Sequence, residues 1–221
     1  MTTAEPEFLT AARTFYDAVA ADYADRYRDA LAAMPWDRAL LGVFAELVTT
    51  AGGGRVADLG CGPGRITGHL AELGLDVRGL DLSPRMVELA RAAHPGIPFE
   101  AGSLLDLPYR DGELAGAVAW YSIIHTPAGQ LPGVFAEFHR VLAPGAPLLL
   151  AFQVGDDALR LDRPFGRPVT LDFRCQRPER IEALAAAAGL RVTTRLVREP
   201  EPDERTPQAY LLAHRTAGAP S

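Results

Sequence analysis

Residues 56–65 read VADLGCGPGR, an apolar run that ends in an acidic residue and then places three glycines within five positions. Such a run is typical of a buried strand, and glycines directly after it remove the Cβ atoms that would keep a ligand away from the backbone. A helix predicted from Arg65 onward aims its free N–H groups into the same space. Ligands bind beyond the carboxyl ends of the strands in an open parallel sheet, so we expect a ligand site at Gly60, Gly62 and Gly64.

The spacing of the glycines narrows the class of ligand. A dinucleotide site requires G-x-G-x-x-G, whereas this turn reads G-x-G-x-G and has Arg65 at the next position; no G-K-[S/T] follows, which excludes a P-loop. Asp58 lies just before the turn, where its carboxylate would repel a pyrophosphate and attract an ammonium or sulfonium group. Asp81 ends the next predicted strand, and its two oxygens could accept both hydroxyls of a ribose. These features indicate a nucleoside with a positively charged, amino-acid-like tail.

Strand-like and helix-like segments alternate along the rest of the chain. Strands are predicted at 55–59, 76–82, 97–103, 114–124, 147–155, 191–200 and 207–215, and helices at 8–33, 37–50, 64–74, 83–95, 131–146 and 177–190. The central strands are almost continuously apolar, and the last two are joined by a proline-rich stretch that is too short for a helix. The predicted fold class is therefore α/β: a Rossmann-like, doubly wound, mostly parallel seven-stranded sheet with a C-terminal antiparallel hairpin and an N-terminal helical cover.

Composition and charge exclude several classes of protein. The longest apolar runs fall short of the roughly 20 residues that span a bilayer, and the N-terminus lacks the pattern of a secretory signal, so we expect a cytoplasmic protein without a membrane partner. A net charge of −6 argues against nucleic acid. Cys61 and Cys175 are the only cysteines and lie far apart, so neither a metal site nor a disulfide is expected. All 22 basic residues are arginine, which excludes a lysine Schiff base and suggests a GC-rich bacterial source.

Four blocks of sequence in this order resemble the class I S-adenosylmethionine-dependent methyltransferases of the small-molecule type, with a domain like methyltransferase domains 11 and 25. The blocks are VADLGCGPG at 56–64, LDLSPRMVELAR at 80–91, GSLLDLPYRDGEL at 102–114 and VLAPGAPLLLAF at 141–152. The resemblance covers roughly residues 14–214. It implies S-adenosyl-L-methionine as the cofactor and S-adenosyl-L-homocysteine as the product.

By position, the resemblance also implies which residues contact the cofactor. The expected contacts are Tyr16, Tyr23, Asp58, Gly60, Cys61, Gly62, Gly64, Asp81, Leu82, Met86, Ser103, Leu104, Ala119 and Trp120. The glycine turn would hold the methionine part and Asp81 would bind the ribose. Leu82 and Met86 would pack near the adenine, and Ser103 and Leu104 would meet its edge. The family often has an aspartate where Ser103 stands, and its fourth strand usually opens with Phe-Asp where this chain has Leu114 and Ala115. Both departures concern local contacts.

The acceptor side of the predicted site depends on the end of the fourth strand and on the irregular segment 155–177. His125 is the candidate base, because its reference pKa of about 6.5 suits proton transfer at neutral pH, although it could equally brace the loop. Asp172 is the acidic alternative. Tyr121 and Arg174 are candidate substrate contacts, and Trp120 and Tyr121 should point to opposite faces of their strand. The arginines of the segment could clamp an acceptor carboxylate or form a solvated loop; they are Arg163, Arg167, Arg174 and Arg177.

The aromatic residues of the N-terminal segment also have two readings. Tyr16 and Tyr23 could close the ligand pocket, or they could simply pack their helix on the core. The remaining histidines, His69, His94, His139 and His214, are predicted to be surface or packing residues because they lie away from the strand ends.

The predicted domain organisation is one methyltransferase domain over 1–221. Its parts are a helical cover at 1–50, a cofactor-binding core at 51–154, a lid or substrate loop at 155–177, a helix and hairpin at 178–214, and a tail at 215–221. The predicted function is transfer of a methyl group to O, N or C of a small metabolite, by a monomer or homodimer. A non-catalytic S-adenosylmethionine-binding regulator and an RNA or protein methyltransferase are the alternatives.

Overall fold

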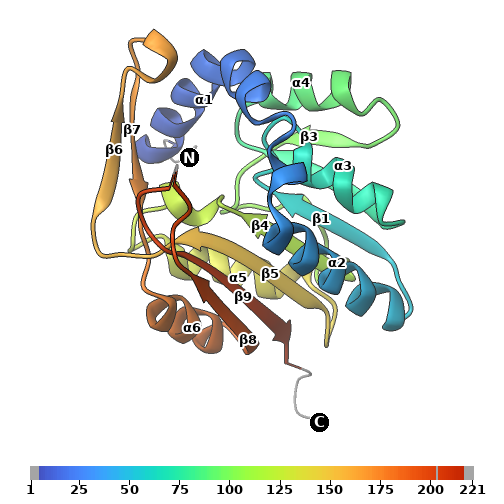
Figure 1. Ribbon diagram of the computed structural model, residues 1–221. Coiled ribbons are helices and arrows are strands. Elements are labelled where there is room, and N and C mark those ends of the chain that lie inside the picture. The colour runs from blue at the N-terminus through green and yellow to red at the C-terminus, as the bar shows by residue number, and fades with distance from the viewer. Residues whose placement is uncertain (1–4, 203, 217–221) are drawn as a thin grey trace.

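The apolar runs of the sequence form one seven-stranded sheet in the order β3-β2-β1-β4-β5-β9-β8. The computed structural model describes residues 5–202 and 204–216 (Figure 1). The strands are β1 Arg55–Leu59, β2 Asp76–Asp81, β3 Phe99–Ala101, β4 Gly116–Trp120, β5 Pro147–Gln153, β8 Leu190–Arg198 and β9 Gln208–Arg215. Neighbours from β3 to β5 run parallel, whereas β9 pairs antiparallel with both β5 and β8. The predicted mostly parallel sheet with an antiparallel hairpin at one edge is confirmed.

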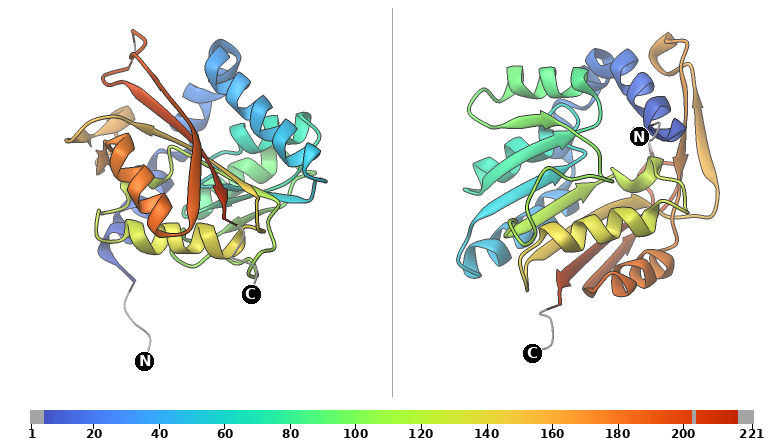
Figure 2. Two further views of the ribbon diagram at one scale, coloured as in Figure 1. Left: turned by 90° about the horizontal axis from the view of Figure 1, so that it is seen from below. Right: turned by 180° about the vertical axis from the view of Figure 1, so that it is seen from behind.

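Helices cover both faces of this sheet. They are α1 Glu7–Tyr27, α2 Pro35–Thr50, α3 Arg65–Glu72, α4 Pro84–Ala93, α5 Leu131–Val141 and α6 Pro178–Ala187, with short 3-10 turns η1 Ala30–Ala33, η2 Ile123–His125 and η3 Pro164–Gly166. One apolar cluster joins the sheet to α5 and α6 through residues such as Phe138 and Ile181, and a second joins the opposite face to α2 and α3 through Phe44 and Leu70. The view from behind in Figure 2 shows α5 and α6 lying across one face of the sheet.

The order of the strands places a topological switch point between β1 and β4. From β1 the chain moves outward to β2 and β3, then returns to β4 on the other side of β1 and continues outward to β5. The helices that follow these strands therefore lie on opposite faces, which leaves a crevice at the carboxyl ends of β1 and β4. The glycine turn opens into that crevice because it directly follows β1.

Segment 155–177 is more regular than its sequence indicates. It forms a two-stranded antiparallel hairpin of β6 Ala158–Asp162 and β7 Thr170–Arg174, with η3 at its tip. Strand β7 packs against α1, and Figure 1 shows the hairpin and α1 side by side at one end of the sheet. The alternation of Leu159, Leu161 and Phe173 accounts for this order, because these side chains turn one face of the hairpin toward the interior.

Other boundaries also differ from the predicted ones. The helix expected over 8–33 ends at Tyr27 and is followed by the separate turn η1, and the strand expected over 114–124 ends at Trp120. Of the predicted tail at 215–221, residues 217–221 lie outside the described residues. Within the part of the chain that the structure describes, no helix is both long and apolar enough to cross a membrane.

Candidate active site

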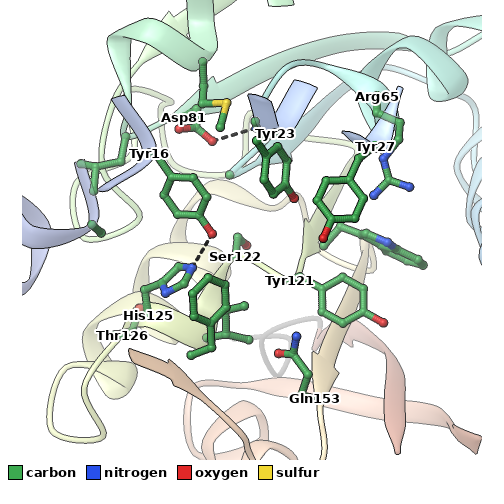
Figure 3. A pocket seen from close by; sticks show the side chains of 18 of the residues that line it. Tyr16, Tyr23, Tyr27, Arg65, Asp81, Tyr121, Ser122, His125, Thr126 and Gln153 are labelled. Atoms are coloured by element: carbon green, nitrogen blue, oxygen red, sulfur yellow. Dashed lines mark hydrogen bonds between the residues drawn. The ribbon is translucent and has the colours of Figure 1, made fainter. Parts of the chain in front are cut away.

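A cavity of about 760 Å³ lies beyond the carboxyl ends of β1, β2, β4 and β5, between α1 and the β6–β7 hairpin (Figure 3). The cavity brings together most of the predicted site residues. Those that line it are Tyr16, Tyr23, Gly60, Gly62, Asp81, Leu82, Met86, Ser103, Leu104, Trp120, Tyr121 and His125. Asp58 and Cys61 instead line a small adjoining hollow beneath the glycine turn. Gly64, Ala119 and Arg174 line neither space.

The three glycines of the turn have different roles. All three have left-handed φ angles, of 85° for Gly60, 54° for Gly62 and 88° for Gly64. A Cβ on Gly60 would collide with Ser122, and one on Gly64 would lie 2.9 Å from the ring of His94, whereas a Cβ on Gly62 would meet no atom within 4 Å. Only Gly62 therefore leaves open space on the cavity side. The expectation that Gly64 makes room for a ligand is wrong, because its missing side chain allows the turn to pack against α4 and β3.

Asp81 joins the turn after β1 to the turn after β2. Its Oδ2 accepts a hydrogen bond from the Gly62 N–H at 2.8 Å, and its Oδ1 accepts one from the Ser83 N–H at 2.8 Å. Burial raises the pKa of this carboxyl to about 6, and the two backbone hydrogen bonds oppose the rise. The predicted ligand thus meets a carboxylate whose oxygens are already engaged once each. Each oxygen keeps a further lone pair for a ligand hydroxyl.

Asp58 is 1% exposed and lies directly below the turn. Its Oδ2 accepts a hydrogen bond from the Thr67 hydroxyl at 2.6 Å, while its Oδ1 is buried without a partner. Burial raises the pKa of Asp58 to about 7. Nη1 of Arg65, which lines the same hollow, is also buried without a partner. A buried acceptor and a buried donor that both lack partners indicate a ligand with a positive and a negative group.

Two predicted cofactor contacts have side chains that belong to the core. The Cys61 thiol packs with Val87, Ala90 and Phe99, so only the backbone of Cys61 lies near the cavity. Ala119 is fully buried in the cluster under α5. Both residues were expected from their position in the motif, which does not specify the direction of a side chain.

The adenine end of the predicted site is formed by the turns after β2 and β3. Leu82, Met86, Ser103 and Leu104 line the cavity there. Ser83 caps α4, because its hydroxyl accepts a hydrogen bond from the Met86 N–H at 3.1 Å, and this cap fixes the start of the helix that carries Met86. The contacts of these residues with the adenine remain predictions.

Three tyrosines of α1 form a row that faces the cavity (Figure 3). The ring centroids lie 6.0 Å apart for Tyr16 and Tyr23 and 4.6 Å apart for Tyr23 and Tyr27. The helix is anchored instead by Phe15, which is 3% exposed and lies 5.8 Å from the Phe173 ring of the hairpin. Burial raises the pKa of Tyr23 to about 12, so its hydroxyl stays protonated at neutral pH. Tyr27 was not predicted as a site residue, although it continues the helical spacing of Tyr23.

His125 is held by two elements that are distant in the sequence. Its Nδ1 lies 3.3 Å from the carbonyl oxygen of Asp172, and its Nε2 lies 2.7 Å from the Tyr16 hydroxyl. A carbonyl can only accept, so Nδ1 carries the proton and Nε2 accepts from Tyr16. Burial lowers the pKa of His125 to about 4, so the ring is neutral at pH 7.

Trp120 and Tyr121 both line the cavity, which contradicts their expected alternation. Strand β4 ends at Trp120, and Tyr121 has a left-handed φ of 54°, so the side chain of Tyr121 turns back toward the same space. The Trp120 ring packs 5.5 Å from Tyr210, whose hydroxyl donates to the buried carboxylate of Asp37 at 2.9 Å. Asp37 also lines the cavity and had no signal in the sequence, since it depends on how α2 docks.

The arginines predicted to clamp an acceptor do not line the cavity. Arg167 pairs with Asp22 at 2.9 Å, Arg177 pairs with Asp156, and Arg174 lies 3.9 Å from the Asp172 carboxylate. The cavity is instead lined by Arg26, Arg65, Arg198 and Arg205. Of these, only Arg65 was singled out in the sequence, because the others depend on how α1 and the β8–β9 hairpin dock.

The remaining predicted residues lie outside the cavity. Arg163 does not line it, and the Asp172 carboxylate faces Arg160 at 3.4 Å, so Asp172 orients His125 through its backbone carbonyl and is not placed as a base. The four other histidines also do not line it. Within residues 5–202 and 204–216, no group of three His, Cys, Asp or Glu side chains could hold a metal ion.

Comparison with known proteins finds similarity to methyltransferases over part of the chain. Residues 56–145 match the family described as Methyltransferase domain. An uncharacterized methyltransferase of Mycobacterium tuberculosis is 36% identical over 121 residues, which are 53% of this chain and 47% of that protein. The chain thus matches about half the length of such curated relatives.

Two solved structures share the fold over nearly the whole chain. Magnesium protoporphyrin IX methyltransferase from Synechocystis, with bound S-adenosylmethionine, has a TM-score of 0.70 at 17% identity and covers 97% of this chain and 100% of its own. A 1,6-didemethyltoxoflavin N1-methyltransferase from Burkholderia thailandensis, with bound 1,6-didemethyltoxoflavin and S-adenosylhomocysteine, has a TM-score of 0.69 at 20% identity and covers 98% of this chain and 93% of its own. Residues 56–145 thus match a methyltransferase domain, and nearly the whole chain shares the fold of these two methyltransferases.

Proposed function

We propose that the protein binds S-adenosyl-L-methionine in this cavity and transfers its methyl group to O, N or C of a small molecule, releasing S-adenosyl-L-homocysteine. One observation carries the cofactor assignment: the unpartnered Oδ1 of Asp58 and the unpartnered Nη1 of Arg65 flank the glycine turn. The ammonium and carboxylate of a methionine tail would satisfy both groups. The zwitterionic tail would then lie under Gly62, where a Cβ would otherwise occupy the open space.

The other parts of the cofactor fit the groups that follow. Asp81 can accept hydrogen bonds from ribose hydroxyls with its remaining lone pairs, and Leu82, Met86 and Leu104 offer apolar surface to an adenine. The cofactor supplies a methyl group on a positively charged sulfur. The sulfur leaves readily because it departs as a neutral thioether. The π faces of Tyr16, Tyr23 and Trp120 line the space around that positive charge and can stabilise it.

Methyl transfer by in-line displacement depends mainly on alignment, which contributes roughly 7–11 kcal/mol in well-oriented systems. The cavity of about 760 Å³ lies within the range of roughly 300–1,000 Å³ that is usual for small-ligand sites. It leaves room for an acceptor between the tyrosine row of α1 and the hairpin. His125 is the proposed base, because its Nε2 carries a lone pair at the cavity wall.

Support for a small acceptor comes from the charge and from the relatives. The net charge of −6 gives no broad basic surface for RNA, and both structural relatives are named for small-molecule substrates. We place the enzyme in the cytoplasm, as a monomer or homodimer. A non-catalytic regulator would bind the cofactor in the same way, so turnover separates the two functions.

Calorimetry with S-adenosylhomocysteine tests the cofactor site. Asp58→Asn should weaken binding by about tenfold or more, since a lost hydrogen bond to a charged group costs roughly 1.5–3 kcal/mol. The matched control is Asp156→Asn, which removes an exposed carboxylate that does not line the cavity and should leave the affinity unchanged. Unchanged affinity in Asp58→Asn would overturn the proposed placement of the tail. Binding without release of S-adenosylhomocysteine from S-adenosylmethionine across a panel of metabolites would favour the regulator.

A further inference from the structure

The Tyr16 hydroxyl occupies the lone pair of the proposed base, His125. Neutral imidazole has one lone pair, on Nε2, and the Tyr16 O–H donates to it at 2.7 Å. An acceptor therefore cannot pass its proton directly to His125 in this arrangement. The Tyr16 oxygen still has lone pairs of its own, and Figure 3 shows its ring inside the cavity with the hydroxyl directed at His125. The group placed to receive the acceptor's proton is consequently Tyr16.

The walls around this pair suit a flat, apolar ring. The Phe173 ring stands edge-on to His125 at 4.6 Å, the Tyr16 ring stands edge-on to it at 5.3 Å, and Leu159 and Leu161 of β6 line the adjacent wall. Edge-to-face geometry of this kind favours a further aromatic ring in the slot. Among the described residues, no arginine hydrogen-bonds to Tyr16 or His125.

The acidity that the acceptor hydroxyl needs depends on how strongly the Tyr16–His125 pair can accept a proton. Burial holds the pKa of His125 near 4 and raises the pKa of Tyr16 well above its ordinary value. Such a pair accepts a proton weakly. A phenol-like hydroxyl, with a pKa of about 10, gives up its proton to such a pair far more readily than a water-like hydroxyl, whose pKa is much higher.

We propose that the methyl acceptor is a hydroxyl on a planar aromatic or enolic ring, and that Tyr16 is a catalytic residue that relays the proton of this hydroxyl to His125. The inference rests on the proposed methyl transfer. As the acceptor oxygen forms its bond to the methyl carbon, the carbon–sulfur bond breaks and its electron pair stays on sulfur. The acceptor proton passes to the Tyr16 oxygen, the Tyr16 proton passes to Nε2, and the imidazolium later returns a proton to water.

Two acceptors of similar shape separate this relay from a structural role. Phenol must lose its proton during transfer, whereas 4-nitrophenol is largely ionised at pH 8 before it binds. Tyr16→Phe and His125→Gln should each lower kcat with phenol by about 10²- to 10⁴-fold, the usual contribution of a positioned base. With 4-nitrophenol the loss should stay below about threefold. The matched control is Tyr109→Phe, which removes a buried, unpartnered hydroxyl outside the cavity and should leave both rates unchanged.

Other results would overturn the relay, the acceptor class or the proposed function. Equal losses with phenol and 4-nitrophenol would show that Tyr16 only shapes the site and would overturn the relay. Methylation of cyclohexanol, benzoate or benzylamine in preference to both phenols would overturn the acceptor class, as would failure of the S-adenosylhomocysteine complex to bind either phenol in calorimetry. Failure of the wild-type protein to bind S-adenosylhomocysteine at all would instead overturn the proposed function.

Discussion

Asp81 shows how one side chain can organise a ligand site before any ligand binds. Its two oxygens accept from the N–H groups of Gly62 and Ser83, so the turns after two adjacent strands hold each other in place. A carboxylate with its pKa raised to about 6 is costly to bury, and these two hydrogen bonds offset part of that cost. The rigidity of the glycine turn and the proposed binding of a ribose therefore depend on the same group.

Gly62→Ala should weaken both the fold and cofactor binding. The φ of 54° costs a non-glycine residue roughly 1–2 kcal/mol of stability, and the new methyl group would occupy the open space beside the cavity. We expect a loss of about 1 kcal/mol in urea unfolding and a fall of at least tenfold in affinity for S-adenosylhomocysteine. Gly74→Ala is the matched control: Gly74 has a φ of 88° with open space around it but lies away from the cavity.

Gly74→Ala should lose a similar amount of stability and keep its affinity for S-adenosylhomocysteine. If both variants lose affinity equally, strain in the backbone and not the space at Gly62 is responsible. If neither does, the tail of the ligand does not lie against Gly62.

At the residue scale, the sequence predicts which residues form the site better than it predicts where their side chains point. Asp58, Asp81, Gly62 and His125 could be found because their chemistry and their place at strand ends are visible in the chain. The inward packing of Cys61 could not, because the local motif fixes the course of the backbone but not which side of the turn meets α4. The Tyr16–His125 hydrogen bond joins residues 109 positions apart, and no local pattern predicts it.

At the element scale, α1 differs from the rest of the site because it is attached to α4 and β7 and not directly to the seven-stranded sheet. It is tied by its packing on α4 and β7, by the hydrogen bond from the Ser83 hydroxyl to Asp17 at 2.5 Å, and by the Arg167–Asp22 ion pair. Exposed ion pairs contribute little, so the buried side chains of α1, among them Phe15 against Phe173, must supply most of the attachment. The helix therefore covers the cavity only as firmly as these apolar contacts allow.

Phe15→Ala should release this cover. Truncation of a buried phenylalanine typically costs about 3–5 kcal/mol, and here the loss falls on the interface of α1 with the hairpin. We expect faster amide hydrogen exchange in α1 and β7 than in β1 and β4, and weaker binding of S-adenosylhomocysteine. Val43→Ala is the control, because Val43 lies half-exposed on α2 and should change neither. Uniform acceleration of exchange across the sheet would show that α1 is part of the global folding unit and not a separate cover.

The hairpin of β6 and β7 explains where prediction from sequence fails at this scale. The inner strands could be predicted because burial on both faces makes them continuously apolar. The hairpin has one face on the cavity and one in water, and its arginines and prolines obscure the alternation of Leu159, Leu161 and Phe173. Its order comes from docking on α1, a contact between segments about 150 residues apart.

At the scale of the whole molecule, the cavity joins parts that fold through different contacts. The carboxyl ends of four strands supply its floor, α1 one wall, the β6–β7 hairpin another, and the loop before β9 its far end. A ligand that fills this space contacts all of them at once. Binding should therefore stabilise the entire fold, and the size of that effect reports how strongly the ligand interacts with the buried charges.

The pH dependence of this stabilisation tests the charge of Asp58 in the whole protein. In the free protein the pKa of Asp58 is raised to about 7, so its contribution to stability is fully present below pH 4 and is lost as the pH rises through 7. An ammonium group beside it favours the ionised form, so binding releases a proton below pH 7 and the affinity for S-adenosylhomocysteine rises with pH.

We therefore expect S-adenosylhomocysteine in large excess to raise Tm more at pH 8 than at pH 5.5. A tenfold change in affinity is about 1.4 kcal/mol, which corresponds to roughly 3–5 °C in a chain of this size. Asp58→Asn carries no titratable group at this position, so the difference between the two pH values should shrink to the part that Asp81, with its pKa of about 6, contributes, whereas Asp156→Asn should keep the full difference. A wild-type Tm shift that is equal at both pH values, or larger at pH 5.5, would mean that the bound ligand places no positive charge at Asp58, and the methionine tail would then have to lie elsewhere in the cavity.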